Sequence, residues 1–145
     1  MKVLVVYDSA YGNTEKIARA IGSAISGDVK VLRAGEVNAA ELNSYDLLVI
    51  GSPTQGGRPM PSVMELLGKI PESVLKGKNF AAFDTRIAIA KLFGFAARKI
   101  ENGLKAKGGN AVAPAQGFNV TAEKAPKLKE GELERAANWA KTLIK

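Results

Sequence analysis

The sequence predicts a single α/β domain over residues 1–145, with a five-stranded parallel sheet in the order 2-1-3-4-5. Apolar stretches of strand length alternate along the chain with amphipathic stretches of helical length. The stretch at 46–51 is apolar without alternation, which is typical of a parallel strand buried on both faces. Polar loops at 9–14, 52–60 and 84–94 follow three of the strands. In this strand order the loops lie together at one edge of the sheet.

Each predicted element has a local reason in the sequence. The first helix is marked by Ile17, Ile21 and Ile25, which recur every four residues, and Gly27 stands where a helix commonly stops. The predicted strands, in chain order, are 3–8, 29–32, 46–51, 78–83 and a fifth one from 111 to 120 that Pro114 interrupts. The other predicted helices are 62–70, 96–107 and 133–144, with one further turn at 39–42.

Two of these helices carry more detailed predictions. Ser62 and Glu65 have the spacing of a capping box at the start of the second helix, which Pro71 ends. In the helix that starts near Ala96, the residues expected to point toward solvent are Arg98, Lys99, Glu101 and Lys105. In the last helix, Trp139 is expected to be a packing residue.

The loop after the first strand has the features of a phosphate site. The first turn of a helix holds backbone N–H groups without internal partners and the positive end of the helix dipole. The candidate donors that the loop adds are Ser9, Tyr11, Asn13, Thr14 and the backbone of residues 10–14, with Gly12 allowing close approach. Without Lys or Arg, the loop suits a phosphate monoester better than a triphosphate with magnesium. The alternative is an ordinary polar loop with Asn13 as the helix N-cap, and spacing alone leaves both open.

Composition restricts the chemistry. The 145 residues include no Cys and no His, which argues against a thiol nucleophile, an imidazole base, a disulfide framework or a metal site. No apolar run approaches the ~20 residues of a membrane span. The chain enters its first strand directly, so we expect a cytoplasmic protein without a signal peptide or membrane anchor.

The net charge of +7 is unevenly distributed. Residues 1–72 hold seven Lys and Arg against eight Asp and Glu, whereas residues 73–145 hold fourteen against six. Such asymmetry favours an acidic partner, and the alternative is a solvated basic face. Nucleic acid is not expected as a partner, because the basic residues are not interleaved with aromatic ones.

Several of these segments together resemble the flavodoxin family over the whole chain. Residues 9–14 are similar to the phosphate loop of that family, in which hydroxyl-bearing residues precede Gly and Thr. Residues 51–57 are similar to its second flavin loop. Residues 83–86 and 131–136 resemble a subgroup of small archaeal and bacterial flavodoxin-domain proteins. The resemblance implies a flavodoxin-like three-layer sandwich and a non-covalently bound FMN.

The resemblance also implies roles for particular residues. The phosphate of FMN would be held by the loop that comprises Ser9, Ala10, Tyr11, Gly12, Asn13 and Thr14. One side of the isoalloxazine ring would be lined by Pro53, Thr54, Gln55, Gly56 and Gly57. A peptide flip at Gly56 or Gly57 would offer a carbonyl to N5 of the reduced ring. The third loop would begin with Asp84, Thr85 and Arg86, near the pyrimidine edge of the ring.

The chain departs from the family pattern in three ways. Tyr11 replaces the middle hydroxyl residue of the usual phosphate loop. The second and third loops lack the Trp or Tyr that typically stacks on the ring. Phe93 and Phe95 are the nearest aromatic residues, and their alternative role is packing at the start of a helix. Typical flavodoxins are acidic, whereas this chain is basic.

We therefore expect an FMN-binding electron-transfer protein, without catalytic side chains, that exchanges electrons with a redox partner protein as a monomer or weak dimer. The basic residues after the third loop would steer an acidic partner toward the flavin; they include Lys91, Arg98, Lys99, Lys105 and Lys107. The alternative function is an FMN-dependent NAD(P)H or quinone oxidoreductase, whose small-molecule substrate would approach an open ring face.

Overall fold

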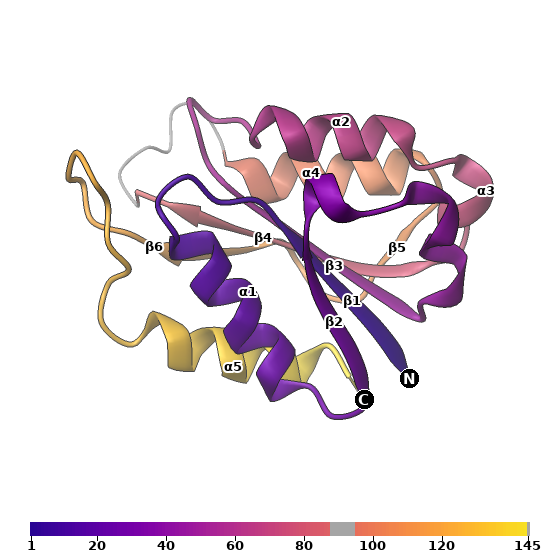
Figure 1. The fold of residues 1–145 in the computed structure, drawn as a ribbon, viewed down its shortest axis with the longest axis horizontal. Coiled ribbons are helices and arrows are strands. Elements are labelled where there is room, and N and C mark those ends of the chain that lie inside the picture. The colour runs from indigo at the N-terminus through magenta and orange to yellow at the C-terminus, as the bar shows by residue number, and fades with distance from the viewer. Residues whose placement is uncertain (88–94, 145) are drawn as a thin grey trace.

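A parallel sheet runs through the middle of the computed structural model, which describes residues 1–87 and 95–144 (Figure 1). Its strands are β1 (Lys2–Tyr7), β2 (Asp28–Arg33), β3 (Leu47–Pro53), β4 (Asn79–Arg86), β5 (Asn110–Ala111) and β6 (Gln116–Asn119). The strand order is β2-β1-β3-β4-β5, and β6 also pairs with β4. The predicted order is confirmed, with β5 and β6 as the two pieces of the interrupted fifth strand.

Helices cover both faces of the sheet and complete the predicted three-layer sandwich (Figure 1). On one face lie α1 (Asn13–Ala24) and α5 (Glu132–Thr142). On the other face lie α2 (Pro61–Lys69), the short α3 (Glu72–Leu75) and α4 (Ala96–Ala106). Between β2 and β3 the chain forms two 3-10 segments, η1 (Ala34–Glu36) and η2 (Ala39–Ser44). Within the described ranges, no helix is both long and apolar enough to cross a membrane.

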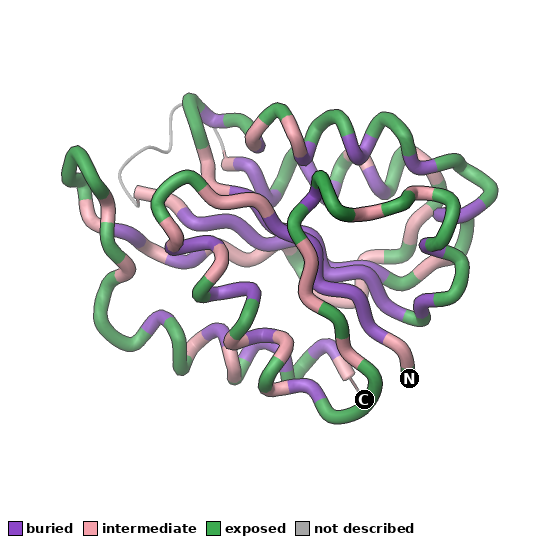
Figure 2. Tube along the Cα trace, viewed as in Figure 1, coloured by how far each residue is buried: buried purple, intermediate pink, exposed green. Residues whose placement is uncertain are grey.

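The alternation of side chains along each strand divides the core into two layers, one on each side of a sheet whose central strands are largely buried (Figure 2). In β1, Leu4 and Val6 face α2 and α4, whereas Val3 and Val5 face α1 and α5. Both sets are buried, as expected of a strand covered on both faces. This explains why β1 and β3 read as continuous apolar runs in the sequence.

Three aromatic side chains fix the packing of α5 on the sheet. Phe83, Phe118 and Trp139 meet in pairs of edge-to-face rings with centroids 6.0–6.3 Å apart. A Cβ at Gly51 would lie 2.1 Å from the ring of Phe83, so only glycine allows this approach. The predicted packing role of Trp139 is confirmed, and its exposed fraction is 9%.

Two of the detailed helix predictions are wrong. The second helix has Met60 as its N-cap and Pro61 as its first residue, so Ser62 cannot form the predicted capping box with Glu65. The hydroxyl of Ser62 instead donates to the carboxylate of Asp8.

The second wrong prediction concerns Glu101 of α4, which was expected to point toward solvent. This side chain is only 6% exposed, and one carboxylate oxygen accepts a hydrogen bond from the backbone N–H of Ala115 at 2.8 Å. The other oxygen lies 3.4 Å from Nζ of Lys105. Glu101 therefore points inward, because it binds the segment that links β5 to β6.

Two lysines close the ends of helical segments on the face of the sheet that α2 covers. Nζ of Lys107 donates to the backbone oxygens of Leu67 at 2.5 Å and Ile70 at 2.7 Å, at the end of α2. Nζ of Lys78 donates to the backbone oxygen of Tyr45 at 2.5 Å, just after η2. Both ammonium groups satisfy carbonyls that a helix end leaves without partners.

Glu132 fastens the start of α5 to β6. Its carboxylate accepts hydrogen bonds from the guanidinium of Arg135, at 2.7 and 2.9 Å, and from the backbone N–H of Asn119 at 2.5 Å. These bonds, chiefly the one from Arg135, lower the pKa of Glu132 below its usual value, against the opposing effect of burial. Arg135 also donates to the backbone oxygen of Gly117 at 2.6 Å.

Glu132→Gln should therefore reduce the free energy of unfolding by about 1–2 kcal/mol near neutral pH. A lowered folded-state pKa gives stability that is present above the unfolded-state pKa and lost as pH falls through the folded-state value. The difference between wild type and variant should consequently shrink in acid. Urea denaturation at about pH 7 and about pH 3 measures both effects. Glu134→Gln, at an exposed position of the same helix, is the control, and an equal loss in both variants would contradict the assignment.

Candidate functional site

The parallel register brings three strand ends to one edge of the sheet. Tyr7 of β1 pairs with Gly51 of β3, and Pro53 of β3 pairs with Thr85 of β4. The loops that follow these strands surround a cavity of about 90 Å³ that opens to solvent. Nine of the predicted site residues line it: Ala10, Tyr11, Asn13, Thr14, Pro53, Thr54, Gln55, Thr85 and Arg86. The predicted residues that do not line it are Ser9, Gly12, Gly56, Gly57 and Asp84.

The loop at 9–14 presents backbone N–H groups to this cavity. Gly12 has φ +90° and is the N-cap of α1, and its own N–H donates to Oγ of Ser9 at 2.9 Å. Within the described residues, the N–H groups with no hydrogen-bond acceptor include those of Ala10, Tyr11, Asn13 and Thr14. These donors and the positive end of a 12-residue helix form a site for an anion.

The carboxylate nearest this loop is turned to other partners. Asp8 accepts hydrogen bonds from Nη1 of Arg33 at 2.9 Å and from the backbone N–H of Ser9 at 2.8 Å, as well as from Ser62. Among the described residues that line the cavity there is no Asp or Glu, and the one cationic side chain is Arg86. The cavity therefore offers donors to an anion without a competing carboxylate.

Two side chains at the start of α1 tie the loop to distant parts of the chain. The hydroxyl of Thr14 is 2.9 Å from that of Thr85, so the helix start is joined to the end of β4. Nδ2 of Asn13 donates to the backbone oxygen of Pro126 at 2.7 Å, in the segment that leads to α5. Asn13 is the first residue of the helix, so the alternative that made it the N-cap is wrong.

The second loop is closed by a tight turn. Gln55 and Arg58 exchange two backbone hydrogen bonds, at 2.8 and 3.1 Å, across Gly56 and Gly57. The φ angles of the two glycines are +58° and +81°, and positive φ at both central residues marks a type I′ turn. Ser52 joins the two ends of the loop, since its hydroxyl accepts a hydrogen bond from the N–H of Met60 at 2.8 Å.

The peptide between the two glycines is the part of this turn that is free to rotate. The peptides on either side of it are fixed by the bonds between Gln55 and Arg58, whereas no bond of the described residues holds the central one. Rotating that peptide converts a type I′ turn into a type II′ turn, in which the second central residue has a negative φ.

The residues at 84–86 belong to β4 rather than to a loop. Asp84 is fully buried and binds the guanidinium of Arg86 at 2.7 and 2.8 Å and the N–H of Ala97 at 2.9 Å. Burial raises the pKa of Asp84, and the bonds from Arg86 and Ala97 oppose that rise. Asp84 thus positions Arg86 and the start of α4 and does not face the cavity.

Arg86 is held from three sides. Its guanidinium lies over the ring of Phe95, 3.5 Å from the ring centroid. A Cβ at Gly117 would lie 2.1 Å from Nε of Arg86, so this glycine makes room for it. The ring of Phe95 therefore packs against the guanidinium of Arg86. The predictions for Phe93 and Lys91 fall outside the described residues.

Three lining residues were not named among the predicted site residues: Ile87, which lies within the predicted third loop at 84–94, and Val120 and Pro126, which lie outside the predicted loops. Ile87 directly follows β4, and Val120 follows β6, so the rule that ligands bind at the carboxyl ends of strands would have indicated both. Pro126 lies in a charged segment whose local sequence has no feature of a ligand site. Its backbone oxygen accepts from Asn13, and bonds between Thr121 and Lys127 and between Lys129 and Asn119 hold the same segment beside β6.

Comparison with known proteins gives consistent relatives. The profile of one family, described as Flavodoxin, matches residues 5–139. Over 86% of its length, the chain is 30% identical to a flavodoxin from Picosynechococcus sp., of which it covers 77%. It is 29% identical to the probable flavodoxin 2 of Bacillus subtilis, with 79% of each chain covered. It is 32% identical to the type A flavoprotein fprA of Rhodobacter capsulatus over 72% of its length, but spans only 28% of that protein.

Solved structures agree with these relatives in fold. The oxidised flavodoxin 2 of Bacillus cereus superposes with a TM-score of 0.82 at 27% identity, covering 99% of this chain and 97% of that one. A flavodoxin from the domain Archaea superposes with a TM-score of 0.81 at 24% identity, covering 97% and 94%. Both likenesses extend over nearly the whole chain.

Proposed function

The chain belongs to the flavodoxin family and is an FMN-binding electron-transfer protein, and we propose that the FMN lies in the cavity among the three loops. The observation that carries this placement is the set of N–H groups without an acceptor in the described chain, where α1 begins: those of Ala10, Tyr11, Asn13 and Thr14. A phosphate monoester is the anion best suited to such a site, because the loop supplies hydrogen bonds and a helix dipole but no cation.

The other features of the cavity support the same ligand. Pro53, Thr54 and Gln55 would flank the ring system beyond the phosphate, and Arg86 would donate near its polar edge. When bound, the flavin supplies redox chemistry in one- or two-electron steps, and the protein supplies position and surroundings.

The turn at 55–58 would adjust the redox potential of the flavin. Because the central peptide has no partner in the described chain, its rotation would offer the carbonyl of Gly56 to the ring at the cost of changing turn type. Gly56 keeps a positive φ in both turn types, whereas Gly57 has a positive φ only in the type I′ turn seen here. The two glycines therefore differ in what a substitution would do.

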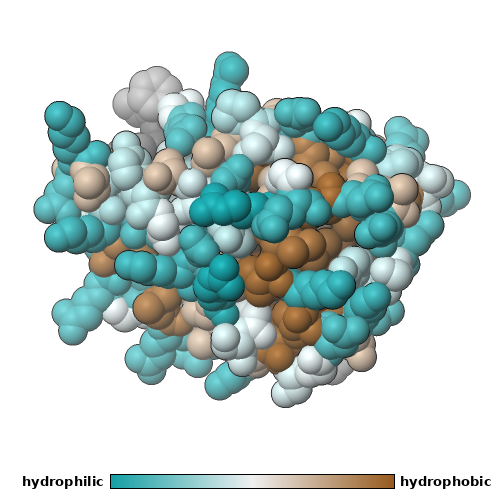
Figure 3. All heavy atoms as spheres, viewed as in Figure 1, coloured by the Kyte–Doolittle hydropathy of each residue, from teal (hydrophilic) through white to brown (hydrophobic). Residues whose placement is uncertain are grey.

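Electron carriers of this family work with redox partner proteins, and we propose that the partner of this chain is acidic. Two of the predicted docking residues have partners within the chain, since Lys107 is bound to backbone carbonyls and Lys105 faces Glu101. Arg98 and Lys99 are exposed in the first turn of α4, whose start is held at the cavity wall by a bond from the N–H of Ala96 to Oγ1 of Thr54. Figure 3 shows mainly hydrophilic side chains at the end of the molecule where the segment between β6 and α5 lies (left).

The alternative function as a reductase of small molecules stays a prediction. Tyr11 is the one aromatic residue among the described lining residues, and it belongs to the phosphate loop. That arrangement would leave a ring face open to a substrate, although it is equally compatible with a carrier.

Thr14→Val should weaken FMN binding by about 10- to 100-fold, because a hydrogen bond to a charged group contributes about 1.5–3 kcal/mol. Riboflavin lacks the phosphate, so its affinity should change much less. Isothermal titration calorimetry of the apoprotein with both ligands makes the comparison. Thr142→Val, near the end of α5, is the matched control. Equal losses for FMN and riboflavin would place the phosphate elsewhere.

Gly57→Ala should favour the rotated peptide, because alanine is strained by about 1 kcal/mol at positive φ. If rotation offers a carbonyl to the reduced ring, the midpoint potential of the first electron should rise by about 40 mV in this variant. Gly56→Ala is strained in both turn types and should shift it little; no atom lies within 4 Å of the added Cβ. Spectroelectrochemical titration measures both, and equal shifts would exclude rotation of this peptide.

Replacing Arg98 and Lys99 together by Gln should flatten the salt dependence of reduction by an acidic electron donor in stopped-flow experiments. Steering raises association rates ~10-fold or more at low salt and fades as the screening length falls to ~8 Å. Lys105→Gln should keep the wild-type slope, because Lys105 is far along the helix and faces Glu101. A wild-type rate that is independent of salt would rule out an acidic docking partner.

A further inference from the structure

The guanidinium of Arg86 keeps free donors after the contacts that hold it. Asp84 accepts hydrogen bonds from Nε at 2.7 Å and from Nη2 at 2.8 Å, and within the described residues Nη1 has no acceptor. Arg86 lines the cavity among the three loops, where it is the one cation of the described lining residues. The N–H groups of Nη1 and the second N–H of Nη2 are therefore available to a ligand in that cavity.

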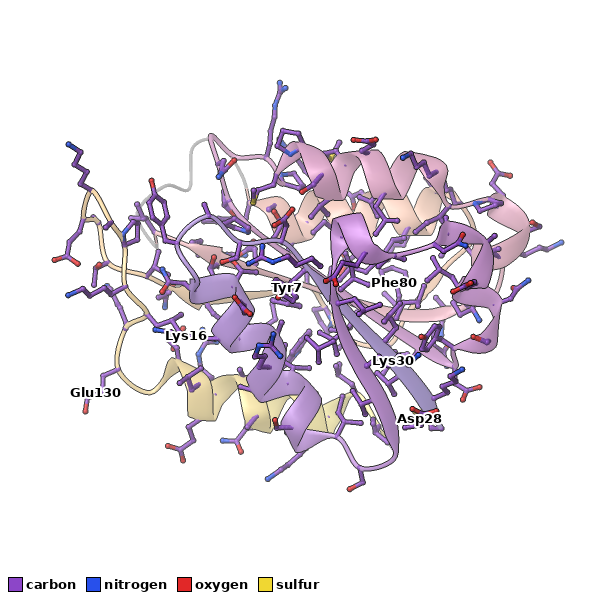
Figure 4. All side chains as sticks on the ribbon, viewed as in Figure 1. Tyr7, Lys16, Asp28, Lys30, Phe80 and Glu130 are labelled. Atoms are coloured by element: carbon purple, nitrogen blue, oxygen red, sulfur yellow. The ribbon has the colours of Figure 1, made fainter. Side chains whose placement is uncertain are left out.

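The place of Arg86 follows from the alternation of side chains along β4. Phe80, Asp84 and Arg86 share the face of the sheet that α4 covers, whereas Thr85 points to the opposite face. Figure 4 shows Phe80 near the start of this strand, and Arg86 ends the strand at the cavity. The cation thus stands on a rigid element rather than on a loop, which favours precise placement.

The charge of Arg86 is fixed in place before a ligand binds. The ring of Phe95 covers one face of the guanidinium, with 3.5 Å between the guanidinium carbon and the ring centroid. Gly117 of the neighbouring strand has no side chain, and a Cβ there would lie 2.1 Å from Nε. A cation held in this way does not have to reorganise when the charge of its ligand changes.

Asp84 lies behind the guanidinium as seen from the cavity. Its side chain is fully buried, it also accepts from the N–H of Ala97, and it does not line the cavity. Because the Coulomb energy falls with distance, a ligand in the cavity interacts more strongly with Arg86 than with this carboxylate. The carboxylate weakens the attraction of an anion to Arg86 but does not reverse it.

The isoalloxazine ring of a flavin changes its charge when it is fully reduced. Two electrons from the redox partner enter the ring, and when one proton follows them to N5, the ring keeps one negative charge on its pyrimidine side. The oxidised ring is neutral, so a cation beside that side binds the reduced ring more tightly. Such a charge is one of the means by which a protein sets the potential of its flavin.

We propose that Arg86 presents its charge to the pyrimidine side of the flavin and raises the potential at which the ring accepts its second electron. The proposal rests on the proposed placement of FMN among the three loops. Asp84 acts in it as a positioning residue, because it holds the guanidinium without touching the ring. With a cation at this position, the chain gives up its second electron less readily than it would with a neutral residue.

Spectroelectrochemical titration of the FMN-loaded protein tests the proposal. Arg86→Gln should lower the potential of the second electron by about 60 mV, which is a tenfold change in a one-electron equilibrium constant. Arg58→Gln is the matched control, since it removes the same charge from an exposed residue of the second loop that does not line the cavity. Its effect should be much smaller, because solvent screens an exposed charge.

A second variant removes the ion pair as a whole. Arg86→Gln alone leaves the buried carboxylate of Asp84 without its cation, which destabilises the fold and adds a negative charge near the ring. Asp84→Asn combined with Arg86→Gln replaces both partners by neutral groups and leaves the net charge of the protein unchanged. The potential of the second electron should still fall by about tenfold in the equilibrium constant, because the charge nearest the ring is gone.

Titration calorimetry of the apoproteins with oxidised FMN and with riboflavin separates a contact to the ring from a contact to the phosphate. Arg86→Gln should change both affinities by the same factor, unlike the expected effect of Thr14→Val. A loss confined to FMN would assign Arg86 to the phosphate and overturn the inference.

The remaining outcomes separate this inference from the proposed function. If the wild-type protein binds no FMN, the cofactor site is wrong and the role of Arg86 fails with it. If FMN binds and the double variant shifts the potential of the second electron no more than Arg58→Gln does, only the role of Arg86 is overturned.

Discussion

The parallel register of β1, β3 and β4 is the constraint on which the site depends. It brings Tyr7, Gly51 and Phe83 side by side, so that β1, β3 and β4 end within three residues of one another at the same edge of the sheet. The bond between the hydroxyls of Thr14 and Thr85 then joins the start of α1 to the end of β4. A slip of one residue in any pairing would turn every side chain of that strand to the other face and separate these hydroxyls.

Two carboxylates near the strand ends are paired with arginines, so neither carries an unmatched negative charge beside the cavity. Asp8 is bound by Arg33 and by the N–H of Ser9, and Asp84 is bound by the cavity-lining Arg86 and by the N–H of Ala97. Each arginine thereby neutralises an acid that would repel a phosphate. Asp84 has a second effect, since its bond to Ala97 fixes the start of α4 beside the cavity.

The sequence patterns predicted the sheet order, the helices and most of the cavity wall because these follow from local periodicity and from the strand-end rule. The wrong predictions concern side chains whose partners are distant in sequence. Ser62 has the spacing of a cap but binds Asp8, and Glu101 lies on a helix face that looks exposed but binds Ala115. Pro126 lies at the cavity beside Asn13, 113 residues earlier, whose side chain donates to its backbone oxygen. No local pattern contains such pairings, whereas Val120 follows a strand end and was predictable.

The lysines that close helical segments change what the positive charge of this chain means. Lys78 and Lys107 donate to backbone oxygens of Tyr45, Leu67 and Ile70, so part of the charge belongs to the architecture. An ammonium group in such a position must leave its carbonyls before its nitrogen can act as a nucleophile. Acylating reagents and amine cross-linkers should consequently distinguish these two lysines from those of the 121–131 segment. A map of amine reactivity would then separate the charge that holds the fold from the charge that meets other molecules.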